Sequence, residues 1–188
     1  ITRSPLDQQG TNVNMSLGER SVRSFSARHA GKIGDNLGYK LSLQSFSGTD
    51  WEYVDPEEIE LRDYDLSRNS TELRIDYRPN DGLTAIVSTG YNSADNIEMT
   101  GLGAGLADGW VSGYYQARVM YRDLFFQAFQ NWTDAGDTFL LRSGGPIRDK
   151  SKLTVLQLQH FYDMGERQRF TYGADVLLTR PDTEGTVS

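Results

Sequence analysis

Apolar and polar residues alternate one by one along much of this chain, while the period of a helix is scarce. Four stretches show the alternation most clearly: LGYKLSLQSFS (37–47), STELRIDYRP (70–79), WVSGYYQARVMYR (110–122) and RFTYGADVLL (169–178). A period of two is the pattern of a strand whose two faces meet different surroundings. We therefore predict an all-β chain of about nine strands, at 11–17, 21–31, 37–46, 70–79, 83–92, 110–122, 125–132, 153–163 and 168–178.

The two faces of these predicted strands have opposite chemistry. One face is aliphatic and aromatic, as with Phe170, Tyr172, Ala174, Val176 and Leu178 at the end of the chain. The other face carries amides and full charges. The residues that we select as candidates for a polar lining are Arg74, Asp76, Gln116, Arg118, Gln157 and Asp175. A soluble sheet would place such an apolar face in a core, but a sheet in a membrane would turn it to lipid.

The connections between the strands alternate in length. Short turns are expected at 34–36, 80–82, 123–124 and 165–166, and longer polar connections at about 47–69, 94–109 and 134–152. The strands are longer than the roughly 5–6 residues usual in soluble sheets and near the roughly 9–11 that cross a bilayer. Short turns at one end and long loops at the other are typical of outer-membrane barrels.

These features predict an antiparallel transmembrane β-barrel, of which this chain supplies an incomplete slice. Single-chain bacterial barrels have an even number of strands, and an odd number would leave open edges. The short turns recur at a spacing of a little over forty residues, which also suits a propeller blade. A blade needs four short strands in that length, however, and here we count two long ones. The barrel wall is therefore favoured over the propeller.

Composition changes this picture little. The net charge of −7 argues against nucleic acid as a partner, because nucleic-acid binding usually needs a basic face. The mean hydropathy of −0.56 is compatible with a barrel, in which polar and apolar residues alternate. No apolar run reaches the roughly 18 residues of a transmembrane helix.

No pattern of catalysis or cofactor binding stands out. His29 and His160 have no partner at metal-ligand spacing, and the chain has no Cys. The carboxylates at 55–60 and 63–65 are expected to form a solvated acidic loop, although counting alone does not exclude a carboxylate pair or a calcium site. GLGAGL (101–106) lacks the spacing of a phosphate-binding loop. We therefore predict neither an enzyme, nor a metal site, nor a cofactor.

Several segments resemble one family. YGADVLLTRPDTEGT (172–186) is similar to a segment in the barrels of TonB-dependent outer-membrane receptors. The stretch 130–160 resembles the segment that precedes it there, and 23–51 resembles the second and third barrel strands. ITRSP (1–5) is similar to the end of the plug domain. The order of these segments, from plug exit through successive hairpins, is the same as in the family.

The resemblance implies a barrel of about 22 strands with a plugged lumen in the bacterial outer membrane. Residues 1–9 would then be the end of the plug and a linker, and 10–188 the first barrel strands with long extracellular loops. Because the chain opens with Ile1 and without a signal sequence, we interpret it as an internal piece of a longer protein.

The same resemblance implies a function and its partners. Such receptors take up a scarce nutrient, such as a metal–siderophore, cobalamin or an oligosaccharide, with energy from the inner-membrane TonB complex. The other expected partners are the protein's own plug domain, lipid and lipopolysaccharide. The polar candidates would support the plug, Trp51 is a candidate ligand contact in an outer loop, and Trp110 and Trp132 would belong to the interfacial girdle.

Two other classes of function stay open. One is a passive porin-like channel, which would have an open lumen; the resemblance of ITRSP to a plug exit argues against it. The other is a soluble β-rich binding or adhesion module, which would fold in water without detergent.

Overall fold

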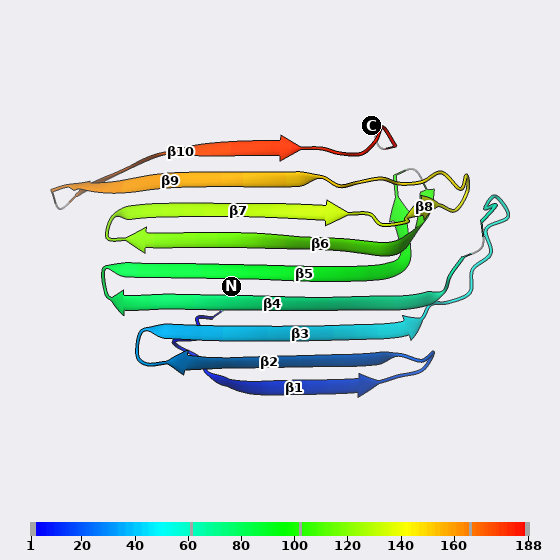
Figure 1. Cartoon of the computed structure of the whole chain (residues 1–188), viewed down its shortest axis with the longest axis horizontal. Helices are drawn as coiled ribbons and strands as arrows, with labels where there is room; N and C mark the ends of the chain where they lie inside the picture. The colour runs from blue at the N-terminus through cyan, green and yellow to red at the C-terminus, as the bar shows by residue number, and fades with distance from the viewer. Residues whose placement is uncertain (1–2, 61, 102, 166, 187–188) are drawn as a thin grey trace.

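The computed structural model describes residues 3–60, 62–101, 103–165 and 167–186. These residues form one antiparallel sheet in the strand order β1-β2-β3-β4-β5-β6-β7-β9-β10, with the short β8 paired to β6 (Figure 1). The strands are β1 (Gly10–Leu17), β2 (Arg23–Ile33), β3 (Leu37–Thr49), β4 (Asp65–Asn80), β5 (Leu83–Thr100), β6 (Gly103–Tyr121), β7 (Leu124–Asp134), β8 (Phe139–Leu140), β9 (Lys152–Met164) and β10 (Gln168–Arg180).

The prediction of an all-β antiparallel sheet is confirmed, and each of the nine predicted strands is present. The two-residue β8 was missed, because a strand that short has no readable alternation. None of the described segments is a helix long and apolar enough to cross a membrane.

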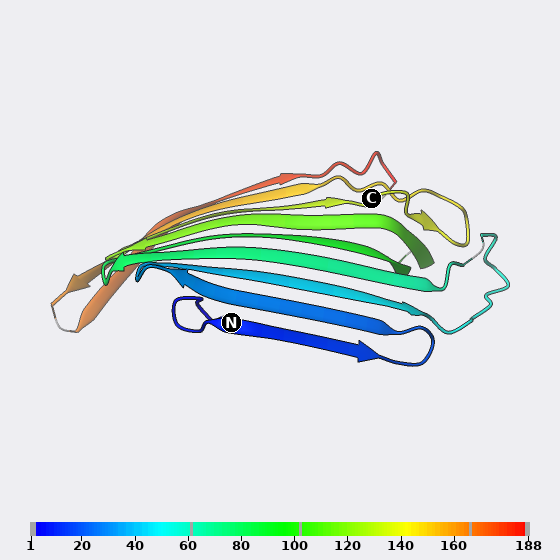
Figure 2. The same cartoon turned by 60° about the horizontal axis from the view of Figure 1, so that its bottom comes forward.

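The sheet is curved and not closed (Figure 2). Strands β1 and β10 lie at its two edges and each pairs with one neighbour within the described part of the chain. The short turns after β2, β4 and β6 share one end of the sheet, and the connections after β3 and β7 share the other (Figure 1). Parts of several predictions lie outside the described residues, namely Ile1, Thr2, Leu61, Leu102, Glu166, Val187 and Ser188.

The predicted long loop at 94–109 is wrong. Strands β5 and β6 continue to Thr100 and from Gly103, and their pairing shifts register between Ala94 and Asn96. This extension contains only a short alternation, in which Ile97 and Met99 lie between Asn96, Glu98 and Thr100. The register shift separates it from the alternation of the preceding stretch, and the glycine-rich stretch 101–105 that follows is typical of a loop. The sequence pattern therefore indicated a loop where backbone hydrogen bonds form a hairpin. The long loop predicted at 47–69, between β3 and β4, is shorter than expected and spans 50–64.

The apolar face of the sheet is the exposed one. Leu41 and Leu73 are each 40% exposed and Tyr172 is 60% exposed, and side chains like them occur on every strand from β1 to β7 and on β9 and β10. The polar face is more enclosed: Lys40 is 4% exposed, Asp76 1% and Gln127 8%. Globular proteins in water show the opposite distribution.

The segment that precedes β1 lies against the polar face. The pyrrolidine of Pro5 and the side chain of Leu6 cover Gly38 of β3, where a Cβ would lie 2.9 Å from the Leu6 nitrogen. The Ser4 hydroxyl donates a hydrogen bond of 2.6 Å to the Asp76 carboxylate. Pro5 and Leu6 are themselves buried, so this segment is packed against the sheet.

Candidate functional site

The polar face divides into two zones along the strands. Near the short turns lies a charged zone, which we define as Lys40, Glu72, Arg74, Asp76, Ser88, Gln116, Arg118, Gln127 and Gln157. Nearer the long connections lies a neutral row that we call the hydroxyl–amide belt, formed by Ser26, Gln44, Ser70, Asn92, Ser112 and Thr133. Residues directly opposite one another on paired strands share a face, so each zone is a continuous stripe.

A buried ion pair forms one half of the charged zone. Arg74 Nε donates to Asp76 Oδ1 at 2.6 Å, and Arg74 Nη2 donates to Asp76 Oδ2 at 2.9 Å. Beside this pair, Lys40 Nζ lies 2.9 Å from Glu72 Oε1. The Lys40–Glu72 pair links β3 to β4, and the hydrogen bond from Ser4 to Asp76 links the segment before β1 to β4. Removal of one partner from a buried pair leaves an uncompensated charge.

A chain of amides forms the other half. Gln116 Nε2 and Arg118 Nε both donate to Gln127 Oε1, at 3.2 and 2.9 Å. Gln127 Nε2 in turn donates to Gln157 Oε1 at 2.8 Å. Gln127 was missed in the sequence. It shares a strand face with Phe125 and Phe129, two residues away on either side, and that face therefore looks apolar.

Five of the six predicted polar residues therefore lie in the charged zone, Arg74 and Asp76 as a pair and Gln116, Arg118 and Gln157 around Gln127. The sixth, Asp175, lies opposite Gln157 on the edge strand β10, and no side-chain hydrogen bond or ion pair to it is found among the described residues. Their place on the enclosed face follows from the register. Contact with a plug stays a prediction for all six.

The hydroxyl–amide belt differs from the charged zone in its hydrogen bonding. Its four central members, Gln44, Ser70, Asn92 and Ser112, lie directly opposite one another on β3, β4, β5 and β6. None of these four side chains makes a hydrogen bond to another described residue. Three of the four, Gln44, Ser70 and Asn92, line a hollow of about 370 Å³. Its lining also includes Ser42 and Tyr114 of the neighbouring row, with Arg28, Glu72 and Gly90.

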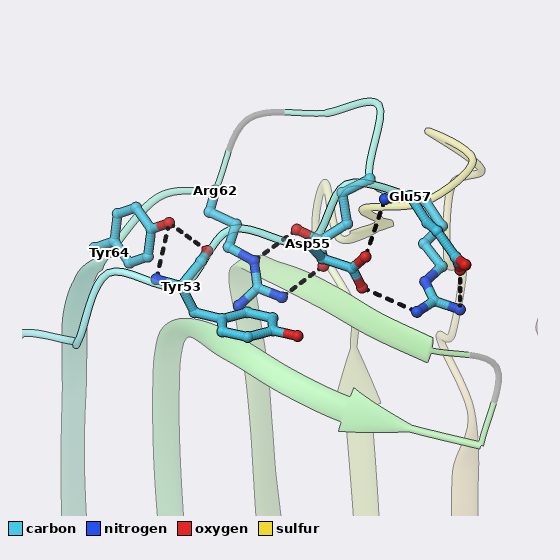
Figure 3. A network of polar contacts seen from close by, with 7 residues as sticks. Tyr53, Asp55, Glu57, Arg62 and Tyr64 are labelled. Carbon is cyan, nitrogen blue, oxygen red and sulfur yellow. Dashed lines mark hydrogen bonds and ion pairs between the residues drawn. The ribbon is translucent and has the colours of Figure 1, made fainter.

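At the end with the long connections, the loop after β3 and the loop after β8 are joined by ion pairs and hydrogen bonds (Figure 3). Arg142, from the loop after β8, donates to the Asp55 carboxylate at 2.9 Å and lies 3.0 Å from that of Glu57. The backbone nitrogens of Ile59 and Glu60 both donate to the Leu141 carbonyl at 3.1 Å. We call this contact between 53–64 and 138–145 the loop clasp.

The loop clasp has a second ion pair within the first loop. Arg62 donates two hydrogen bonds to Glu58, at 2.6 and 2.5 Å, and its guanidinium lies 4.9 Å from the centre of the Tyr53 ring. The Tyr64 hydroxyl donates to the Tyr53 carbonyl at 2.7 Å. The amide of Glu57 and the side chain of Arg142 lower the pKa of Asp55 below its ordinary value, so the clasp favours the ionised carboxylate.

The three tryptophans occupy different surroundings. Trp51 lies in the loop after β3, where the Arg20 guanidinium is 4.6 Å from the centre of its ring. Trp132 lies on the apolar face, tilted against Tyr91 with 6.1 Å between ring centroids. Trp110 falls on the polar face by its register, since it alternates with Val111. Only Trp132 is thus on the face that a lipid girdle would need; the roles of all three stay predictions.

Within the described ranges, no group of three or more His, Asp or Glu side chains is arranged to hold a metal ion. Comparison with protein-family models, with curated proteins and with solved structures shows no match to this chain.

Proposed function

We propose that this chain is part of the wall of a bacterial outer-membrane β-barrel, and that the barrel is a receptor for energy-coupled, TonB-dependent uptake of a scarce nutrient. The observation that carries the proposal is the inverted sheet. Its exposed face is apolar across nine strands, whereas its charged residues lie on the enclosed face. Outer-membrane barrels have this arrangement, with lipid outside and a polar lumen inside.

The size of the apolar face argues for lipid. Its exposed side chains include Met15, Phe25, Leu41, Leu43, Leu73, Ile75, Val87, Tyr115, Phe126, Leu156, Leu158, Tyr172 and Val176. Soluble monomers rarely expose an apolar patch of more than a few hundred Å². In a membrane, each such side chain would instead contribute the free energy of leaving water.

The charged zone and the segment before β1 support a plugged lumen over an open one. Ser4, Pro5 and Leu6 already cover part of the polar face, and Asp76 is buried beneath them. A porin-like channel needs a lumen wall that water can reach, and a Lys40 that is 4% exposed does not fit that need. The resemblance of ITRSP and YGADVLLTRPDTEGT to TonB-dependent receptors points the same way.

The full-length protein provides the test. Expressed in a Gram-negative host, it should fractionate with the outer membrane and migrate faster on electrophoresis before heating than after it. Liposomes that contain it should not swell in small neutral solutes, since the lumen is closed. Free diffusion of such solutes would establish the porin-like channel instead. A protein that is monomeric and folded in the soluble fraction would exclude both membrane functions.

A further inference from the structure

The hydroxyl–amide belt consists of neutral groups that can both donate and accept hydrogen bonds. Hydroxyls and carboxamides are the side chains with this double capacity. Across β2 to β7 the belt contains four hydroxyls and two carboxamides and no charged side chain. A ligand that satisfies such a row must also offer donors and acceptors in alternation, as the hydroxyls of a sugar do.

The central belt is unsatisfied within the described part of the chain, in contrast to the charged zone beside it. Gln127 makes three side-chain hydrogen bonds, at 3.2, 2.9 and 2.8 Å, whereas Gln44 and Asn92 make none with described residues. Both Gln44 and Asn92 are exposed. The side-chain donors and acceptors of the four central belt residues are therefore available to a bound molecule, while Asp76 and Gln127 of the charged zone are already paired.

Tyr114 forms a flat surface next to the belt. Its ring lies across Gly90 on the neighbouring strand, so closely that any Cβ at position 90 would overlap the ring. One ring face is thus packed on the backbone, and the other can stack on the apolar C–H face of a pyranose.

The lining of the hollow carries no excess of either charge. Its two charged residues, Arg28 and Glu72, have opposite signs, and Glu72 is paired with Lys40 at 2.9 Å. The hollow of about 370 Å³ has the scale of a small organic ligand. The size of the hollow, its balanced charge and the hydrogen-bonding capacity of the belt all favour a neutral polar solute as the ligand.

We propose that the hydroxyl–amide belt and Tyr114 form a binding site for a neutral, hydroxyl-rich solute, namely an oligosaccharide. The belt supplies the hydrogen bonds and Tyr114 the stacking surface. This inference rests on the proposed function and specifies the class of nutrient that the receptor takes up.

The test is calorimetric titration of the full-length protein in detergent with maltohexaose, cellohexaose and citrate as probes. At least one of the two hexasaccharides should bind. Tyr114→Ala should weaken that binding by at least about tenfold, as the loss of an aromatic anchor does, and Tyr114→Phe should restore most of it. Asn92→Ala should weaken it to a smaller extent. The matched control is Tyr115→Ala, because Tyr115 is adjacent in sequence but lies on the apolar face, and it should bind like the wild type.

Three results would overturn the inference: neither hexasaccharide binds; a hexasaccharide binds but Tyr114→Ala and Asn92→Ala leave the affinity unchanged; or citrate binds and Arg28→Gln abolishes that binding, which would assign the hollow to an anion. Heat-dependent migration of each variant shows whether it is folded. Failure here is separable from failure of the proposed function, because outer-membrane fractionation and a closed lumen do not depend on which nutrient is bound.

Discussion

The charged zone and the hydroxyl–amide belt lie on one face of one sheet, next to each other along the same strands. In the charged zone, Asp76 accepts hydrogen bonds from Arg74 and Ser4, and Gln127 has three side-chain partners; both Asp76 and Gln127 are almost inaccessible to water. In the belt, Gln44 and Asn92 are exposed and have no side-chain partner among the described residues. The difference indicates two roles for polar side chains. Those of the charged zone stabilise the sheet through hydrogen bonds and ion pairs, whereas those at the centre of the belt are available to bind a ligand.

Both zones lie on the polar face of the sheet, and the opposite, apolar face is exposed. We expect the isolated 188-residue chain to fail to form a stable monomer in water, because its apolar face and both edge strands are uncovered. Light scattering and thermal unfolding without detergent measure this, and detergent micelles serve as the control. A sharp, reversible transition of a monomer in plain buffer would contradict it and would favour a soluble binding module.

The largest effect of a single substitution is expected at the centre of the charged zone. Asp76→Ala removes the carboxylate that Arg74 and Ser4 contact, and should lower the free energy of unfolding by about 3 kcal/mol. The measurement is denaturant unfolding of the full-length protein in micelles. Asp175→Ala is the matched control on the same face and should change it by less than about 0.5 kcal/mol. Equal effects at the two positions would show that burial of the ion pair has no consequence.

A pair of amide substitutions compares the two zones directly. Gln127→Leu disrupts the chain from Gln116 to Gln157 and should cost about 1–3 kcal/mol, because several enclosed groups lose a partner. Asn92→Leu makes the same chemical change in the belt and should cost less than about 0.5 kcal/mol. If Asn92→Leu is as destabilising as Gln127→Leu, the belt is packed against another part of the protein and is no free binding surface.

The smallest effect concerns the loop clasp, which lies beyond both zones. Because the folded loop lowers the pKa of Asp55, its ionised form stabilises the clasp above the ordinary value of 3.8, and this contribution is lost as the pH falls through the lowered pKa. Exchange of the Ile59 and Glu60 amides, which donate to Leu141, reports the state of the clasp.

Asp55→Asn is the control for this titration, since it has no proton to lose. At pH 7 the two amides should exchange faster in Asp55→Asn than in the wild type. Below the pKa of Asp55 the difference should vanish when both proteins are compared at the same pH. A difference that persists in acid would show that Asp55 acts through its shape and not through its charge.

The strands were predictable because their cause is local. Each of the nine alternating stretches has one apolar face, and the short turns at 34–36 and 80–82 contain Gly, Asp and Asn, which suit tight turns. The prediction of strands failed where pairing is not determined by the local sequence. In the hairpin that extends to Thr100 and resumes at Gly103, a register shift interrupts the alternation and the glycines at 101, 103 and 105 suit a loop, so the pairing of the two strands was not readable from the sequence.

The candidate sites divide in the same way. Arg74, Asp76, Gln116, Arg118 and Gln157 were predictable as one face, because charged residues at alternate positions share a side of a strand. Gln127 was not, since Phe125 and Phe129 mask it, and Trp110 is on the face opposite to that of Trp132. The loop clasp joins Asp55 to Arg142, 87 positions away, and no local pattern reports such a contact.

By itself, the sequence determined that this is an antiparallel β protein with one apolar and one polar face, because a period of two acts on each strand independently. Only the tertiary structure decided which polar residues are satisfied and which are not. That depends on register across neighbouring strands: it places Gln127 between Arg118 and Gln157, and it aligns Gln44, Ser70, Asn92 and Ser112 in a row with no side-chain partner among the described residues.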